Sequence, residues 1–562
     1  MQVPEEYGCP DLAFSVWTPG GYTLHRHAAD VLDLHATSPA GNTLHATKTG
    51  LDGWRVECGP EGGYTVRLRV HALAPRTPYS DHVDDRLLFA NTVVVLPYLP
   101  DHQDAPAILR IDPPAGWHAT CSLARRDDGT WTAPDWDALA DAVLAAAPGL
   151  TTRSFTVDGT AFTVAFSERP PSDLDLDAVV DAHRKLAEAA SRTFGGLPFD
   201  RYLFFYKVGP KGSHGGLEHS FSTAMGISRS SVATTAAFRE ALGLPAHEFV
   251  HAWNVKRARP HALRPYDYAH AQPTRLLWVA EGWTSYYGPL LLERAGLRTP
   301  AQLYATLSSR LRYHRNNPGN RFWSLLDYSR DSWLDSSIPF LSFRSYYVKG
   351  SLSGLDLDLR IRAASGGRHT LDELMRTLLT DPRLVRDGYT MADLRSLASR
   401  LAGHTMDPWF ERVVERPGYI DLSQSLAAVG LRLVPDAARA AASFTGIALT
   451  DAEDDRGARV RWVEPGSPAE AAGLGEGDLL LAVDGHTGDH AALEEVLKRL
   501  KPGRKVTLGV VRGDRFLELG LEPVPVDPLR RAVRVEEDPA AGPDQVAARE
   551  AWLQGPDEGE NR

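Results

Sequence analysis

Alternating apolar and polar positions indicate β structure in the first part of the chain. Residues 64–70 alternate between large apolar side chains and threonine or arginine, which is the period-two pattern of a half-buried strand. The dipeptide Asp158-Gly159 lies between two further apolar segments and suits the two-residue turn of a hairpin. We therefore expect residues 1–168 to form an N-terminal β-rich domain.

The apolar pattern becomes mostly helical after the proline pair Pro170-Pro171. Residues 201–206 are a continuous aromatic and apolar run, which predicts a buried strand. Residues 230–430 then show mostly helical periodicity. Strands followed by helices are typical of an α+β unit, which we place at residues 169–435.

A third unit is predicted over residues 440–525. In residues 490–500 apolar side chains recur at i, i+3, i+4 and i+7, as on the buried face of a helix. Gly513-Asp514 suits the turn of a closing hairpin. Residues 526–562 are rich in Pro, Ala, Glu, Asp and Gly, which predicts a disordered tail. The expected fold class is multidomain α+β.

The composition is that of a globular protein and disfavours two classes of partner. The 562 residues are 43% apolar, but no apolar run approaches the length of a membrane span. The formal net charge of −11 disfavours nucleic acid, because such binding relies on Lys and Arg to neutralise phosphates. We expect neither a membrane nor a nucleic-acid partner.

The N-terminus and the cysteines favour a cytoplasmic location. Residues 1–6 have neither the basic start nor the apolar segment of a signal peptide. The chain has three cysteines, Cys9, Cys58 and Cys121. Their wide spacing and odd number argue against a disulfide framework or a zinc ribbon.

The candidate chemistry is concentrated in the pentad His247-Glu248-Phe249-Val250-His251. Residues four apart lie on the same face of a helix, so the two histidines can hold one Zn2+ and the glutamate can face a water beside it. Such a pentad arises by chance in about 4% of chains of this length and histidine content, so its context matters. The alternative is two surface histidines beside a solvated glutamate. The apolar flanks argue against it, because buried His and Glu need partners.

The ends of the predicted metal-site helix are marked by prolines. Pro245 either lies in the first turn of the helix or marks a kink in a helix that began near Phe238. Pro260 is expected to end the helical stretch, after a basic segment that suits a helix C-terminus.

A catalytic zinc site needs a third protein ligand. Glu281 is preferred because the apolar run at residues 276–280 leads directly into it, and a carboxylate there is unfavourable unless it is paired or bound to a metal. Ser285 follows four residues later and is a candidate hydrogen-bond partner of a ligand. The other candidates for the third ligand are Asp267, His261, His270 and Glu293.

Four segments together resemble the glycyl aminopeptidase family of zinc metallopeptidases. They are the segment that starts at His247-Glu248, Gly215-Gly216-Leu217-Glu218-His219, Glu281-Gly282-Trp283-Thr284-Ser285-Tyr286-Tyr287 and Tyr346-Tyr347-Val348-Lys349-Gly350. They occur in the family's order, and the resemblance covers most of the chain. It implies a thermolysin-like, mostly helical catalytic domain. It also implies that His247, His251 and Glu281 bind one Zn2+ and that Glu248 is the general base acting on the attacking water.

The resemblance implies two further roles, and each has an alternative. Tyr347 would stabilise the tetrahedral oxyanion, although Tyr346 is a competing donor. Glu218 would hold the free α-ammonium of the substrate, although it can also be a structural ion-pair partner. Gly215 and Gly216 precede it in a strand-like segment, where glycines let a peptide backbone approach.

The third unit resembles a PDZ domain. Thr445-Gly446-Ile447-Ala448-Leu449 is similar to the carboxylate-binding loop of such domains, and residues 463–474 and 477–480 also match PDZ segments. PDZ domains bind C-terminal peptides by adding a strand, so a C-terminal peptide is a possible partner. The alternative is a PDZ fold that only packs on the catalytic domain.

The leading hypothesis is a zinc-dependent aminopeptidase that removes small N-terminal residues, with glycine or alanine implied by the family. A zinc endopeptidase would instead cleave N-blocked peptides and would not need Glu218. A PDZ-based adaptor with a vestigial metal site is disfavoured, because a vestigial site need not keep both histidines and both glutamates.

Overall fold

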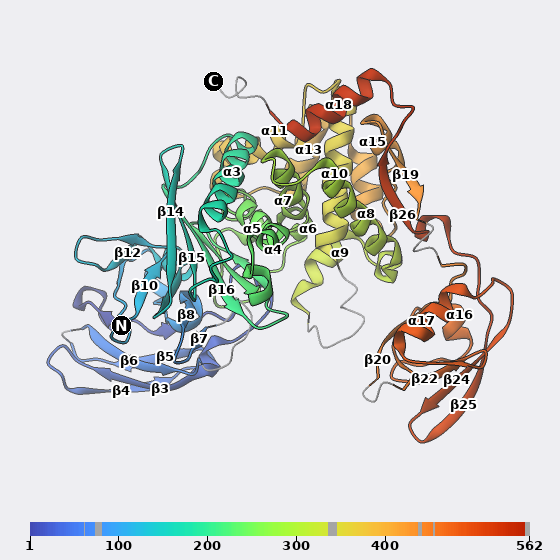
Figure 1. Ribbon diagram of the computed structural model, residues 1–562. Coiled ribbons are helices and arrows are strands. Elements are labelled where there is room, and N and C mark those ends of the chain that lie inside the picture. Colours follow the sequence, from blue (N-terminus) through green and yellow to red (C-terminus); the bar gives the residue numbers. More distant parts are fainter. Residues whose placement is uncertain (61, 73–80, 335–344, 437–440, 453–455, 557–562) are drawn as a thin grey trace.

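The computed structural model describes all residues except 61, 73–80, 335–344, 437–440, 453–455 and 557–562. Three units follow one another along the chain: a β-rich unit, a large helical unit built on a five-stranded sheet, and a small β-rich unit set apart from the other two (Figure 1). The expected α+β multidomain class is confirmed. Within the described residues, no helix combines the length and apolar character that crossing a bilayer requires.

The N-terminal unit contains three small sheets. A six-stranded sheet has the order β1-β6-β3-β4-β5-β2, and two others have the orders β10-β13-β8-β7 and β11-β12-β9. The strand expected at residues 64–70 is β6, and its side chains alternate between the interior and the solvent. The elements are β1 (Gln2–Val3), β2 (Leu12–Ala13), β3 (Val31–Thr37), β4 (Thr43–Lys48), β5 (Gly53–Glu57), β6 (Tyr64–Val70), β7 (His82–Val83), β8 (Leu88–Asn91), α1 (Thr92–Val95), β9 (Ala107–Leu109), β10 (His118–Cys121), β11 (Ala124–Arg125), β12 (Trp131–Ala133), α2 (Trp136–Ala140) and β13 (Val143–Ala147).

Cys9 and Cys58 form a disulfide bond, so the expectation drawn from cysteine spacing was wrong. Cys9 precedes β2 and Cys58 follows β5, and these two strands pair antiparallel. The pairing therefore brings together two cysteines that are 49 residues apart in the sequence. Because disulfides persist mainly in oxidising compartments, this bond does not favour the expected cytoplasmic location.

The central sheet carries the helical unit. Its order is β14-β15-β16-β18-β17, with β14 (Thr151–Val157), β15 (Thr160–Phe166), β16 (Arg201–Gly209), β17 (His214–Glu218) and β18 (Ser222–Ser228). The predicted hairpin at Asp158-Gly159 is confirmed, since both residues have positive φ and join β14 to β15. Because β15 pairs in parallel with β16, this hairpin belongs to the central sheet. The predicted N-terminal domain, residues 1–168, therefore includes two strands of the central sheet.

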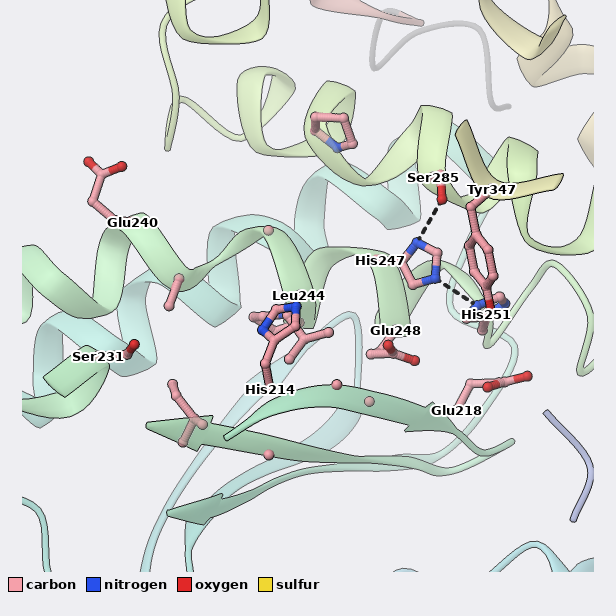
Figure 2. Close-up of a pocket in the computed structure, with 18 of the residues that line it drawn as sticks. His214, Glu218, Ser231, Glu240, Leu244, His247, Glu248, His251, Ser285 and Tyr347 are labelled. Atoms are coloured by element: carbon pink, nitrogen blue, oxygen red, sulfur yellow. Dashed lines mark hydrogen bonds between the residues drawn. The ribbon is translucent and has the colours of Figure 1, made fainter. Parts of the chain in front are cut away.

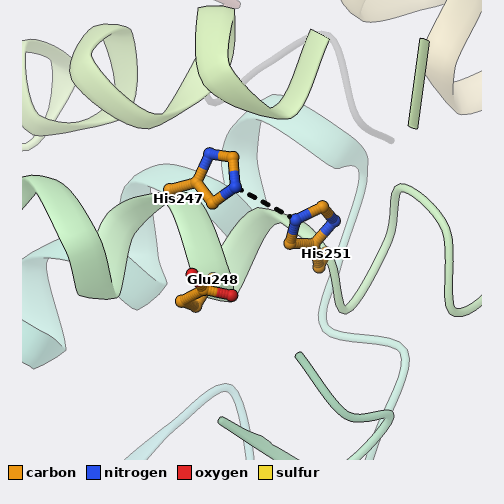
Figure 3. Close-up of side chains that lie close together, drawn as sticks. All are labelled: His247, Glu248 and His251. Carbon is orange, nitrogen blue, oxygen red and sulfur yellow. Dashed lines mark hydrogen bonds between the residues drawn. The ribbon is translucent and has the colours of Figure 1, made fainter. Parts of the chain in front are cut away.

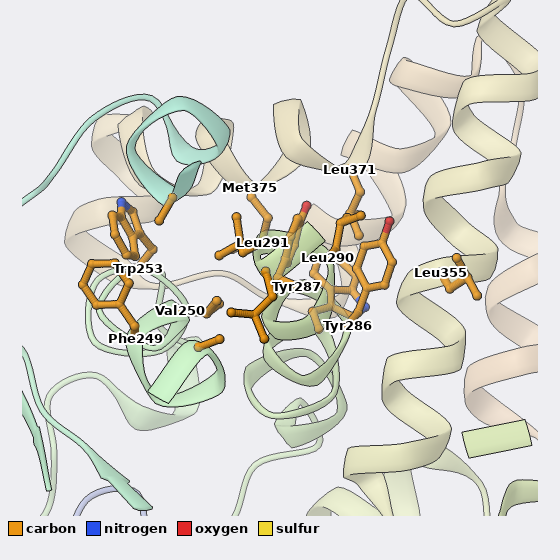
Figure 4. Close-up of a cluster of buried hydrophobic side chains, with 14 of the residues drawn as sticks. Phe249, Val250, Trp253, Tyr286, Tyr287, Leu290, Leu291, Leu355, Leu371 and Met375 are labelled. Carbon is orange, nitrogen blue, oxygen red and sulfur yellow. The ribbon is translucent and has the colours of Figure 1, made fainter. Parts of the chain in front are cut away.

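The central sheet is buried on both faces. One face packs against the second N-terminal sheet through a cluster that includes Phe89 and Phe205, and the other packs against the helices through Phe162 and Phe204. Figure 4 shows the core between the helices. The helices are α3 (Leu176–Phe194), α4 (Thr235–Ala241), α5 (Gly243–Val250), α6 (Leu277–Ala280), α7 (Gly282–Arg294), α8 (Pro300–Asn316), α9 (Leu325–Arg330), α10 (Tyr346–Ser365), α11 (Leu371–Thr380), α12 (Pro382–Asp387), α13 (Met391–Ala402), α14 (Asp407–Trp409) and α15 (Ser423–Ala428).

The predicted metal-site helix, α5, is shorter than expected. It begins at Gly243, with Pro245 in its first turn, and it ends at Val250 rather than near Pro260. Beyond Val250 the chain continues in turns, because the Asn254 side chain donates to the carbonyl groups of Val279 and Ala280. These tertiary hydrogen bonds draw the segment away from helical geometry.

The C-terminal β-rich unit has the elements predicted for it. Its sheet has the order β20-β21-β22-β24-β25, with β20 at one edge, and α17 covers residues predicted to be helical. The hairpin at Gly513-Asp514 joins β24 to β25. The elements are β20 (Ile447–Asp451), β21 (Ala458–Val463), α16 (Pro468–Ala471), β22 (Leu479–Val483), β23 (His486–Thr487), α17 (His490–Arg499), β24 (Val506–Arg512) and β25 (Arg515–Leu521).

The segment expected to be a disordered tail is folded up to residue 556. Strand β26 (Val533–Glu537) pairs with β19 (Leu431–Pro435), and α18 (Pro543–Gln554) packs on α7. Trp552 is fully buried, and its Nε1 donates to the Tyr286 hydroxyl at 2.9 Å. The composition of the segment does not predict this folding, because a few buried side chains are enough to anchor a polar segment to an existing core.

Candidate functional site

His247 and His251 lie side by side at the C-terminal end of α5 (Figure 3), and the Glu281 carboxylate lies beside both. The Nε2 atoms of the two histidines lie 3.2 Å apart. Glu281 Oε2 lies 3.5 Å from His247 Nε2 and 3.2 Å from His251 Nε2. A tetrahedral ion with ligands at about 2.0–2.2 Å has ligand–ligand separations of about 3.3–3.6 Å. The three atoms therefore have the spacing of three vertices of such a site.

The protonation of His251 supports a cation at the centre of this triangle. Its Nδ1 lies 2.8 Å from the Asn254 carbonyl oxygen, which can only accept a hydrogen bond. Nδ1 therefore carries the proton, and Nε2 of the neutral ring presents a lone pair. Glu281 is 2% exposed, and its Oε2 lies within 3.5 Å of both Nε2 atoms, so it presents a further lone pair to the same point. Lone pairs that converge in this way fit a bound metal ion.

Neighbouring polar groups orient the two histidines. Ser285 Oγ lies 3.3 Å from His247 Nδ1. The sequence analysis predicted that Ser285 would bond one of the ligand candidates. Asn254 joins His251 to the segment that carries Glu281, since its side chain also bonds Thr284 Oγ1. Metal-binding histidines ordinarily have such a partner on the second ring nitrogen.

The other sequence candidates for the third ligand lie elsewhere. Among the described residues, none of the four belongs to a group of converging ligand atoms. His270 Nδ1 bonds Asp267 Oδ2 at 2.9 Å on the surface, and His261 Nδ1 bonds the Asp387 carbonyl oxygen. Glu293 lies twelve residues beyond Glu281 in α7.

Glu248 is buried between His247 and strand β17 (Figure 2). Its carboxyl group packs on Gly216, where a Cβ would lie 2.3 Å from Glu248 Cδ. Only glycine fits at this position without moving Glu248. Burial raises the pKa of Glu248 well above its usual value, as expected for a carboxyl group that can take up a proton.

Glu218 ends strand β17 at one end of the same cavity. It is 3% exposed, and its Oε1 has no hydrogen-bond partner in the described structure. A ligand atom of its carboxylate lies within 4.8 Å of those of His251 and Glu281. The N-terminal unit closes this end, because a Cβ on Gly20 would lie 2.7 Å from Glu218 Oε2. The sequence analysis did not identify Gly20, because no local sequence pattern relates it to Glu218, about 200 residues further along the chain.

Tyr347 and Tyr346 begin α10 above the site. Tyr347 lines the cavity, is 37% exposed, and its ring centroid lies 6.1 Å from that of His247. Tyr346 stacks on Tyr347 at 4.7 Å and packs against two hydrophobic clusters. The position of Tyr347 in the cavity wall favours it as the group that meets a bound molecule.

A buried charge network joins the N-terminal unit to the site. Asp141 Oδ1 lies 2.8 Å from Lys256 Nζ and 3.2 Å from His219 Nδ1, and Asp141 Oδ2 accepts from the Ser220 N–H. His219 directly follows Glu218. Asp141 therefore holds the end of β17 that carries the buried carboxylate, a role with no signal in the local sequence.

The cavity that joins these groups has a volume of about 710 Å3. Gly215 and Gly216 of β17 form one wall, and the two histidines and Glu281 lie opposite. Strand β17 is at the edge of its sheet and lines the cavity, a position that suits pairing with an extended chain.

The loop expected to bind carboxylates in the third unit lies beside strand β20. Gly446 has φ of +78°, and Ile447, Ala448 and Leu449 begin the edge strand next to α17. Glu464 of this unit forms ion pairs with Arg321 of the helical unit and with Arg530. These two pairs connect the third unit to the rest of the molecule.

Comparison with known proteins agrees with this architecture. The family profile described as M61 glycyl aminopeptidase matches residues 240–353, the Peptidase M61 N-terminal domain matches residues 1–147, and the PDZ domain matches residues 443–522. A Synechocystis protein that bears the name serine protease HhoA is 39% identical over 67 residues, which are 12% of this chain and 17% of that relative.

Similar folds occur among solved structures. An aminopeptidase N family protein from Idiomarina loihiensis has a TM-score of 0.86 at 24% identity, with 97% of this chain and 95% of that one covered. The M1 zinc metallopeptidase from Deinococcus radiodurans has a TM-score of 0.44 at 16% identity, with 68% and 83% covered. The first of these likenesses extends the agreement in fold to nearly the whole chain. The chain therefore carries a segment of the M61 glycyl aminopeptidase family of metallopeptidases at residues 240–353, that family's N-terminal domain at residues 1–147, and a PDZ domain at residues 443–522.

Proposed function

We propose that this protein is a zinc-dependent aminopeptidase that releases a small N-terminal residue from peptides. The observation that carries the proposal is the environment of Glu218. Its buried carboxylate lacks a partner for Oε1, lies beside the ligand triangle and is capped by Gly20. A free α-ammonium offers such a carboxylate a charge-assisted hydrogen bond, and the cap leaves no path for further residues upstream.

The ligand set His247, His251 and Glu281 suits zinc, which binds two imidazoles and a carboxylate in catalytic sites. Zinc held there would polarise the scissile carbonyl and lower the pKa of a water to about 7. The remaining chemistry belongs to side chains of this chain.

Glu248 is the proposed general base. Its buried carboxylate would take the proton of the attacking water and then deliver it to the nitrogen of the departing amine. Gly216 supports this role, because its missing side chain leaves the space that the Glu248 carboxyl group occupies.

Tyr347 is the proposed donor to the oxyanion. Its place in the cavity wall near His247 supports this assignment over Tyr346. A phenol that donates only as negative charge develops on the carbonyl oxygen accelerates the reaction rather than binding the substrate.

The substrate is proposed to lie antiparallel along the outer edge of β17. That strand runs from His214 to Glu218, so an antiparallel peptide begins at Glu218 and continues toward His214. Gly215 and Gly216 would let its backbone approach. The description of the family as glycyl aminopeptidases supports a small first residue, glycine or alanine.

The test compares an Ala-initiated peptide with its N-acetylated twin on zinc-loaded protein. The free peptide should be cleaved at least about a hundred-fold faster, because acetylation removes the charge that Glu218 binds. Glu218→Gln should reduce this ratio. Equal cleavage of both peptides would instead identify an endopeptidase, and no cleavage of either would refute a peptidase active on such substrates.

We also propose that the PDZ domain binds a C-terminal peptide between β20 and α17. The edge position of β20 supports strand addition. The backbone N–H groups of the Gly446–Leu449 segment would donate hydrogen bonds to the peptide's terminal carboxylate. Fluorescence anisotropy with a labelled random C-terminal peptide library, compared with the same library as amides, tests this; equal binding of acids and amides would contradict it.

A further inference from the structure

The catalytic cavity has a basic end opposite Glu218. The residues that line it include Ser231 and Glu240 near α4, Arg298 just before α8, and Arg310 within α8. Figure 2 shows Ser231 and Glu240 at the far side of the cavity from Glu218, with the histidines between them. The cavity therefore extends well beyond the metal ligands.

Arg310 is a cation without a compensating carboxylate. Its Nη1 is buried and has no hydrogen-bond partner, and Arg310 forms no ion pair with any other described residue. Burial and the nearby charge of Arg298 together lower the pKa of Arg310 to about 10. A buried charge without a partner is unfavourable unless a ligand supplies the opposite charge.

Arg298 differs from Arg310 in this respect. Its Nη2 donates to the Glu240 carbonyl oxygen at 3.3 Å, and the Glu240 carboxylate favours its charged form. It also lies beside Gly243, at the start of α5. Arg298 therefore has protein partners at this end of the cavity, whereas Arg310 has none among the described residues.

The direction of the substrate places a peptide C-terminus on this side. A peptide whose N-terminus meets Glu218 and that runs antiparallel to β17 passes the ligand triangle and continues toward His214. The cavity thus has an acidic end for the ammonium group and a basic end for a downstream negative charge.

We propose that Arg310 binds the C-terminal α-carboxylate of the substrate, so that the preferred substrates are short peptides held by both charged ends. This inference rests on the proposed aminopeptidase function. A guanidinium matches a carboxylate in a planar, two-bond geometry. Pairing would satisfy the buried Nη1 and would select peptides of the length that spans from Glu218 to Arg310.

The experiment measures kcat/KM for alanine peptides of two to six residues, each as the free acid and as the C-terminal amide. We expect the acid to exceed the amide by about ten- to a hundred-fold at the matching length, as for a hydrogen bond to a charged group. Longer peptides should show little difference. This comparison uses the wild-type protein and needs no variant.

Variants then assign the effect to one residue. Arg310→Gln should lower kcat/KM for the free acid of the matching length and change kcat/KM for its amide by less than about two-fold. The acid-to-amide ratio of kcat/KM should therefore fall to about one. Arg312→Gln is the matched control, because Arg312 lies on the same helix and bonds Ser309 in an exposed position. A loss of fold would lower the rates for acid and amide equally and would not change their ratio.

Three outcomes separate this inference from the proposed function. Ala-4-nitroanilide has no carboxylate and reports aminopeptidase activity alone. If the protein cleaves it but acid and amide are equal at every length, the role of Arg310 is overturned and the aminopeptidase stands. If an acidic side chain in an amidated peptide restores the rate, the α-carboxylate is not the ligand. If neither the nitroanilide nor any peptide is cleaved, both proposals fail.

Discussion

Gly282 and Gly350 are in backbone contact where α7 crosses α10. A Cβ built on Gly282 would lie 2.5 Å from Gly350 Cα, and one built on Gly350 would lie 2.6 Å from the Trp278 carbonyl oxygen. Gly282 directly follows Glu281, and Gly350 lies three residues after Tyr347. The contact therefore sets the spacing between a metal-ligand candidate and the proposed oxyanion donor.

We expect Gly350→Ala to reduce both stability and activity. The new methyl group meets backbone atoms that cannot rotate away, so the two helices must separate, at about 1–3 kcal/mol. The separation should also lower kcat, because Glu281 and Tyr347 move apart. Thermal unfolding and peptide hydrolysis measure the two effects. Gly50→Ala, at a position with open space, is the control; an unchanged melting temperature for Gly350→Ala would contradict the prediction.

Glu248→Gln should abolish most of the activity and leave the metal in place. Glutamine cannot take a proton from water, and loss of general-base catalysis typically lowers rates by about a hundred- to ten-thousand-fold. His247→Ala should instead lose both metal and activity. Zinc content by elemental analysis and kcat with an Ala-initiated peptide separate the two variants. Loss of zinc from Glu248→Gln would show that Glu248 is a ligand.

Gly20→Ala should weaken the use of peptides with a free N-terminus. The added methyl group would lie 2.7 Å from Glu218 Oε2, and Gly20 has φ of +103°. We expect at least about a ten-fold decrease in kcat/KM, because a displaced carboxylate loses its charged hydrogen bond. Gly41→Ala introduces a similar backbone strain at a φ of +85° with no neighbour nearby. Equal effects of both variants would mean that strain alone, and not the cap over Glu218, causes the loss.

Asp141→Asn should destabilise the joint between the N-terminal and catalytic domains. It leaves the buried Lys256 ammonium without its carboxylate, a change that typically costs about 3–5 kcal/mol. Burial tends to raise the pKa of Asp141, but Lys256 and His219 hold it well below its usual value of 3.8. A carboxyl group with a lowered pKa stabilises the fold above pH 3.8 and loses this contribution as the pH falls further.

The difference in unfolding midpoint between wild type and Asp141→Asn should therefore be constant at neutral pH and narrow below about pH 4. Urea unfolding at pH 7 and pH 3 measures it. The surface pair of Arg386 and Asp387 provides the control, because Asp387→Asn should change stability by less than about 1 kcal/mol. If the difference in unfolding midpoint between wild type and Asp141→Asn grew at pH 3, it would contradict the lowered pKa of Asp141.

Local spacing predicted much of the candidate site. The helical period places His247 and His251 on one face, and the apolar run before Glu281 marked a carboxylate that enters the core. The same reasoning found the turn at Asp158-Gly159 and the helix at residues 490–500, because each depends on residues within about ten positions. The match of whole segments to a family then added Glu218 and Tyr347, which no period or composition singles out.

Contacts between distant segments needed the tertiary structure. Cys9 meets Cys58 only because β2 pairs with β5. Trp552 is buried only because the helical core already offers a surface for α18. Composition describes which residues a segment contains. Whether the segment folds depends also on the surface against which it can pack.

The sequence by itself determined the chemistry of the site, because the types and short-range spacing of the ligand candidates are local properties. Only the tertiary structure decided the shape of the cavity. Gly20 and Asp141 come from the N-terminal domain, and Arg310 comes from α8, which follows Glu281 in the chain. These residues meet the catalytic groups through packing between domains and helices, which no local pattern in the chain encodes.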